Sequence, residues 1–92
     1  MEKLHFEVFG KVQGVFFRKH TQAEAQKLHL VGWVKNTTHK TVVGIAEGDK
    51  PHISEFQHWL KTKGSPKSTI RKAEFKLETI HHKSFSSFEI HK

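Results

Sequence analysis

Cysteine is absent from this chain of 92 residues, proline occurs twice and glycine occurs six times. The lack of cysteine excludes disulfides and thiolate metal ligands, so the packing of one apolar core must stabilise the fold. The scarcity of proline and glycine leaves no stretch with the composition of a flexible or polyproline linker. We therefore expect a single domain that spans residues 1–92.

Long hydrophobic runs are also missing, since the apolar stretches are as short as residues 15–17. A membrane-spanning helix needs about 20 apolar residues. Residues 1–10 alternate apolar and polar side chains, whereas a signal peptide contains an apolar core of about 7–15 residues. These absences favour a cytoplasmic protein with no membrane partner, and we expect it to be a monomer.

Acidic residues are the minority charge, because 9 Asp and Glu stand against 16 Lys and Arg, for a formal net charge of +7 with histidine neutral. This balance favours anionic partners, namely phosphate-bearing small molecules, nucleic acid or an anionic membrane. A solvated basic surface would have the same composition. Charge alone does not choose among these interpretations.

A histidine-based metal site is not indicated, although the chain contains nine histidines. None belongs to an H-E-x-x-H motif, and His52 and His58 are six residues apart, a spacing that does not share a helix face. We therefore expect solvated histidines, no metal and no organic cofactor.

Hydrophobic periodicity predicts five strands and two helices. The expected strands cover residues 4–12, 31–37, 41–46 and 72–78, with a last short strand at Phe88 and Ile90. One helix is expected at 18–29, where Thr21, Ala25 and Leu28 share a face. A second begins near Asp49, a good capping residue, buries Ile53, Phe56 and Leu60, and ends at Gly64.

The resulting order is β-α-β-β-α-β plus a short C-terminal strand. It predicts an α+β, ferredoxin-like two-layer sandwich, with an antiparallel sheet and two helices on one face. This arrangement hosts enzymes, RNA-binding modules and regulatory domains, so the fold does not define the function.

The segment 10–18 (GKVQGVFFR) joins the first strand to the first helix. A turn containing glycine at a helix N-terminus can direct several backbone N–H groups into one anion-binding concavity. Arg18 adds a planar fork of donors that matches two phosphate oxygens. From these residues alone, an ordinary turn with a surface arginine is the alternative.

Four ordered blocks of the sequence resemble the acylphosphatase family. The string G-x-V-Q-G-V-x-F-R at 10–18 is similar to the family signature, and GWVxNT at 32–37 with TVxG at 41–44 is similar to its second block. WL at 59–60 and GSPxSxI at 64–70 follow at matching spacing. The resemblance covers about residues 6–90, and FFRKHT at 16–21 is most similar to the small animal enzymes.

This resemblance implies a hydrolase that cleaves the carboxyl–phosphate bond of acyl phosphates with water as nucleophile. Arg18 and Asn36 would be catalytic, with Arg18 holding the phosphate and Asn36 positioning the water. The phosphate-binding residues would be Gln13, Gly14, Val15, Phe16, Phe17 and Arg18. Acyl phosphates and inorganic phosphate would be the partners, with no metal or cofactor. Nothing in the sequence marks a dedicated pocket for the acyl group.

Two positions depart from the family pattern, because Lys40 and His29 stand where relatives usually have glycine. A residue with a Cβ adopts a positive φ only at a cost. We therefore expect an effect on local stability and none on the catalytic residues.

Two other functions stay open on the residues alone. An RNA-binding module of this fold would carry stacking aromatics on its two central strands, and residues 41–46 contain none. An inactive relative that serves as an interaction module is the second, and the presence of both Arg18 and Asn36 argues against it only weakly. Trp33 and Trp59 are expected in or at the edge of the core.

Overall fold

The computed structural model describes residues 1–14 and 16–91, and these form five strands and two helices. The elements in chain order are β1 (Glu2–Lys11), α1 (Phe17–Lys27), β2 (Val31–Asn36), β3 (Val42–Gly48), α2 (Lys50–Thr62), β4 (Thr69–Thr79) and β5 (Phe88–Ile90). The predicted order, with its short last strand, is confirmed. Neither helix in this part of the chain is both long and apolar enough to cross a membrane.

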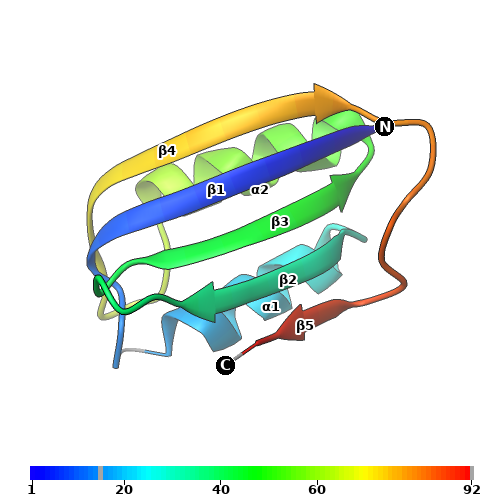
Figure 1. Cartoon of the computed structure of the whole chain (residues 1–92). Helices are drawn as coiled ribbons and strands as arrows, with labels where there is room; N and C mark the ends of the chain where they lie inside the picture. The colour runs from blue at the N-terminus through cyan, green and yellow to red at the C-terminus, as the bar shows by residue number, and fades with distance from the viewer. Residues whose placement is uncertain (15, 92) are drawn as a thin grey trace.

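The strands form one sheet in the order β4-β1-β3-β2-β5, and both helices cover the same face (Figure 1). β1 pairs antiparallel with β3 and β4, and β2 pairs antiparallel with β3. β5 joins β2 in parallel, so the prediction of an antiparallel sheet is wrong for this last pair. The reason is that the connection after β4 crosses to the opposite edge at one end of the sheet, and β5 therefore enters in the direction of β2.

The core lies between the sheet and the helices. The predicted inward-facing residues of the two helices are all buried, namely Thr21, Ala25, Leu28, Ile53, Phe56 and Leu60. Leu4, Phe6 and Val8 of β1 are buried as well. The Phe56 ring makes edge contacts with Phe6 and Phe88, which links α2 to both ends of the chain. Leu77, by contrast, is 51% exposed on the edge strand β4.

His29 and Lys40, the two residues that stand where relatives usually have glycine, both adopt the left-handed backbone conformation, with φ of 59° and 65°. Each therefore keeps a glycine-like backbone at a cost of roughly 1–2 kcal/mol. Asp49 occupies the N-cap of α2 as predicted, but its side chain makes no capping hydrogen bond. The expected penalty is thus local, and it falls in turns outside the segment 10–18.

A buried carboxylate holds the connection between β4 and β5. Glu47, at the end of β3, is fully buried, and its Oε1 accepts a hydrogen bond from the Ser84 N–H at 2.6 Å. Its Oε2 lies 3.2 Å from Lys3 Nζ in an ion pair, but makes no hydrogen bond of good geometry with the described residues. Glu47 therefore fixes the path along which the chain returns to β5.

Replacing Glu47 with alanine should lower the free energy of unfolding by about 3 kcal/mol, because the Ser84 amide and a partly buried ammonium lose their buried partner. Glu74→Ala is the matched control, since Glu74 pairs with Lys72 on the surface with both side chains more than half exposed. That control should cost about 0.5 kcal/mol or less. Urea denaturation of both variants measures the difference, and equal losses would contradict this role of Glu47.

Candidate active site

The turn between β1 and α1 leaves the start of α1 open. Gly14 has a φ of 73°, and Phe16, the N-cap residue, has a φ of 58°. No described side chain caps the helix, and its first turn holds no acidic residue. The first N–H groups of a helix without a cap are available to an anion, which the positive end of the helix dipole also favours. Val15, which belongs to the predicted phosphate-binding set, lies outside the described residues.

Phe17 anchors this turn to the core. Its side chain is 1% exposed, and its ring centroid lies 5.9 Å from that of Trp59 in α2. Gly64 lies so close that a Cβ there would approach the Phe17 ring to 2.7 Å. Because Phe17 points inward, its neighbours Phe16 and Arg18 are directed away from the core, with Phe16 exposed and Arg18 half-buried.

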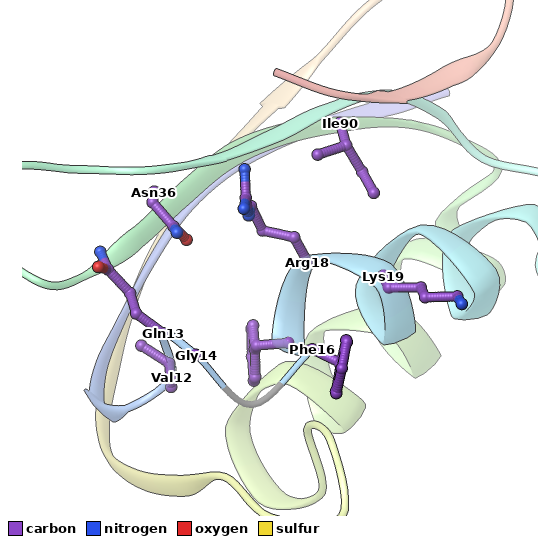
Figure 2. Close-up of a pocket in the computed structure, with 9 residues that line it drawn as sticks. Val12, Gln13, Gly14, Phe16, Arg18, Lys19, Asn36 and Ile90 are labelled. Atoms are coloured by element: carbon purple, nitrogen blue, oxygen red, sulfur yellow. The ribbon is translucent and has the colours of Figure 1, made fainter. Parts of the chain in front are cut away.

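Arg18 projects from the first turn of α1 toward the end of the sheet. Its guanidinium extends in the direction of Asn36 and Ile90 (Figure 2). One of its terminal nitrogens, Nη1, donates a hydrogen bond to the His91 carbonyl at 3.3 Å. The His91 N–H in turn donates to the Val34 carbonyl at 2.8 Å. The residue after β5 therefore supports the guanidinium and leaves other N–H donors of Arg18 for a ligand.

Asn36 is the last residue of β2, and its side chain lines the same pocket as Arg18 (Figure 2). Its Oδ1 is buried and has no hydrogen-bond partner among the described residues. A buried acceptor without a partner costs free energy, so such atoms in proteins are usually satisfied by water or ligand. The Asn36 carboxamide is therefore suited to hold a water molecule.

The turn after Asn36 is fixed by a chain of hydroxyl groups. The Thr41 hydroxyl donates to Glu7 Oε2 at 2.6 Å, and the hydroxyls of Thr37 and Thr41 lie 2.7 Å apart. Thr37 Oγ1 also accepts the N–H groups of His39 and Thr41, each at 3.2 Å. These bonds give the end of β2, and hence Asn36, a defined position.

Gln13 connects the two halves of the site. Its side-chain amide donates to the carbonyls of Thr37 and Thr41, at 3.0 and 2.9 Å. The loop that precedes α1 is thereby tied to the turn that follows Asn36. Gln13 was predicted to bind phosphate through its backbone N–H group, and the side chain adds this connection, which the sequence did not reveal.

A pocket of about 400 Å³ joins these parts. The predicted residues that line it are Gln13, Gly14, Phe16, Phe17, Arg18 and Asn36. Val12, Lys19 and Ile90 line it as well, and sequence reasoning missed them. Lys19 could have been found as the neighbour of Arg18 in the first turn of the helix. Ile90 had no local signal, because the parallel pairing of β5 with β2 brings it there.

The electrostatics of the pocket favour an anion. Among its described lining residues, Arg18 and Lys19 are cations and none is a carboxylate. In the part of the chain that the structure covers, no group of three or more His, Asp or Glu side chains is arranged to hold a metal ion. The positive charge near the helix N-terminus therefore comes from Arg18, Lys19 and the backbone.

Comparison with known proteins agrees with this geometry. A model of the family described as acylphosphatase matches residues 4–90. Acylphosphatase-1 of Homo sapiens is 56% identical over 86 residues, which cover 92% of this chain and 87% of the relative. Acylphosphatase-2 of Rattus norvegicus is 45% identical over 91 residues, which cover 98% of this chain and 94% of the relative.

A solved structure extends the comparison to the fold. The crystal structure of acylphosphatase from Bacillus subtilis superimposes with a TM-score of 0.92 at 33% identity, and the match covers 100% of both chains. The match to the family model and the similarity to these relatives lead to one conclusion. This chain belongs to the acylphosphatase family.

Proposed function

We propose that the pocket hydrolyses the carboxyl–phosphate bond of acyl phosphates and releases a carboxylate and inorganic phosphate. Arg18 and the backbone N–H groups of residues 13–17 hold the phosphate, and Asn36 positions the attacking water. The observation that carries this proposal is the convergence of Arg18 and Asn36, from separate elements, on one pocket at an uncapped helix N-terminus. Membership of the acylphosphatase family supports the activity itself.

Binding of the phosphate depends on two kinds of donor. The backbone N–H groups at the start of α1 are fixed in place by the fold, and Arg18 adds a charged planar fork that can hold two oxygens at once. Phosphoryl transfer requires mainly positioning and stabilisation of negative charge. Donors fixed before the reaction lower the barrier when they lie closest to the charge that develops in the transition state.

The water is held by an amide rather than by a base. The Asn36 carbonyl oxygen accepts a hydrogen bond from the water, and the NH₂ group can donate one to the phosphate or to the water. An amide is too weak a base to remove the proton, and no carboxylate is among the described residues that line the pocket. The proton therefore passes to a phosphate oxygen of the substrate itself.

The leaving group departs without protonation. A carboxylate is the conjugate base of an acid with a pKa near 4, so it is stable as an anion at neutral pH. The site therefore needs no general acid, which agrees with a lining of one arginine, one lysine, two amide side chains, apolar side chains and backbone.

We further propose that the protein acts as a monomeric, single-domain cytoplasmic enzyme on small molecules and has no nucleic-acid partner. One cluster of buried apolar residues runs through both helices and the sheet. β3, a central strand, presents Val42, Gly44 and Ala46 on one face and no aromatic residue on either. β3 therefore lacks the aromatic residues on which RNA-binding modules of similar topology stack bases.

Arg18→Ala should lower kcat/KM for an acyl phosphate by about 10³-fold or more, because the negative charge on the transferred phosphoryl group loses the main cation that stabilises it. Arg18→Lys should still lose about 10²-fold, since an ammonium cannot replace the two-pronged contact. Circular dichroism should show that both variants are folded. A folded lysine variant with wild-type kcat/KM would contradict the proposed contact.

Asn36→Ala should lower kcat by about 10²-fold, because the water loses its orientation. Inorganic phosphate should inhibit this variant competitively with nearly the wild-type inhibition constant, whereas Arg18→Ala should bind phosphate much more weakly. Steady-state kinetics with added phosphate measures both quantities. If the two variants lost phosphate affinity equally, the separate roles of Asn36 and Arg18 would be refuted.

Selectivity should follow the leaving group. An aromatic acyl phosphate should be cleaved several orders of magnitude faster than an alkyl phosphate, whose leaving alkoxide has a conjugate acid with a pKa near that of water, about 15.7. The measurement compares kcat/KM for both substrates on one preparation of the protein. Comparable values would reveal a general acid, and His20, two residues from Arg18, would be the first side chain to replace.

A further inference from the structure

Phe16 combines three features that do not stabilise the fold. Its large apolar side chain is 73% exposed, and its backbone has a φ of 58° although it is not glycine. It is also the N-cap of α1, a position where Ser, Thr, Asp and Asn are preferred because their side chains can accept a helix N–H. An exposed ring on a strained backbone at the edge of a pocket is available for contact with a ligand.

Phe16 and Lys19 line two neighbouring hollows. One is the pocket that contains Arg18 and Asn36, and the other is a groove of about 350 Å³ on the outer side of α1, completed by His20 and Ala23. Because the two share Phe16 and Lys19, these hollows are adjacent, with Phe16 and Lys19 on their common border. Pockets that hold whole small molecules measure about 300–1,000 Å³, so there is room for more than a phosphoryl group.

The direction of the reaction decides which part of the substrate lies over Phe16. In phosphoryl transfer the attacking oxygen and the leaving oxygen lie roughly in line through phosphorus. Asn36 is on one side of Arg18, and Lys19 is on the other (Figure 2). This step rests on the role of Asn36 given under Proposed function. A water held by Asn36 attacks phosphorus from the Asn36 side, so the carboxylate leaves on the opposite side, toward Lys19 and Phe16.

We propose that Phe16 is a specificity-determining residue that binds the acyl portion of the substrate. Its ring offers an apolar surface on which an aromatic or other bulky apolar acyl group can pack, whereas an acetyl group is too small to use it. The Lys19 ammonium, which extends away from Arg18 (Figure 2), adds a long-range attraction to the carboxylate oxygen as it gains charge during cleavage. The reaction is unchanged: the bond from phosphorus to the carboxyl oxygen breaks, and its electron pair leaves with the carboxylate.

The test compares benzoyl phosphate with acetyl phosphate on the whole chain. Phe16→Ala should reduce the ratio of kcat/KM values, benzoyl over acetyl, by about tenfold, mainly through a higher KM for benzoyl phosphate. Phe16→Leu, which keeps an apolar side chain, should give an intermediate ratio. Leu77→Ala is the matched control, because Leu77 is also a large exposed apolar residue but lies on the edge strand β4, and it should leave the ratio unchanged.

The ratio of kcat/KM values for benzoyl and acetyl phosphate distinguishes the loss of a contact with the acyl group from damage to the phosphate site. Damage to the backbone around residue 16 would weaken the binding of both substrates and of inorganic phosphate to the same extent. The ratio of kcat/KM values, benzoyl over acetyl, would then stay as it is in the wild type. An unchanged ratio in Phe16→Ala would therefore overturn the role of Phe16, while hydrolysis by the unmodified protein would still support the proposed function. If the unmodified protein cleaved neither substrate, the proposed function would fail, and this inference with it.

Discussion

The burial of Phe17 is the constraint on which the site depends. This ring lies in the core against Trp59, at the first residue of α1, and so fixes both where the helix begins and how its first turn is rotated. Phe16 and Arg18, on either side, must then point away from the core. The anion-binding N–H groups, the guanidinium and the exposed ring thus owe their positions to one packed side chain rather than to contacts of their own.

The rest of the site is brought to this turn by hydrogen bonds at the ends of strands. Gln13 ties the loop before α1 to the turn after Asn36, and the hydroxyls of Thr37 and Thr41 fix that turn on Glu7. The return of the chain to β5, held by a buried glutamate, places the His91 carbonyl against Arg18. A site that works by positioning needs such supports, because a displacement of about 1 Å can cost 10²-fold in rate.

Local patterns were sufficient to predict most of the fold, whereas the pairing of Arg18 with Asn36 came from the resemblance to the acylphosphatase family. Alternation and helical spacing identified the elements, and the motif at 10–18 with Asn36 pointed to the residues that the structure brings into one pocket. The parallel pairing of β5 was not predictable, because it depends on the route of the connection after β4. For the same reason Ile90 was missed.

Two further features contradict local residue preference. The left-handed backbones of His29 and Lys40 were expected only because relatives usually have glycine at these positions, and not from the residues themselves. The exposure of Phe16 is equally hidden, since three apolar residues in a row give no indication of which one is buried. Only the packing of Phe17 decides that Phe16 faces the pocket, where an acyl group would pass.

The most direct test of this account asks which atom the water attacks. Hydrolysis of an acyl phosphate in ¹⁸O-labelled water, followed by mass spectrometry of both products, locates the new bond. A water held by Asn36 in line with the bond between phosphorus and the leaving oxygen must place the label in inorganic phosphate, and the carboxylate must stay unlabelled. Label in the carboxylate would mean attack at the carbonyl carbon, and would contradict the roles assigned to Asn36 and Arg18.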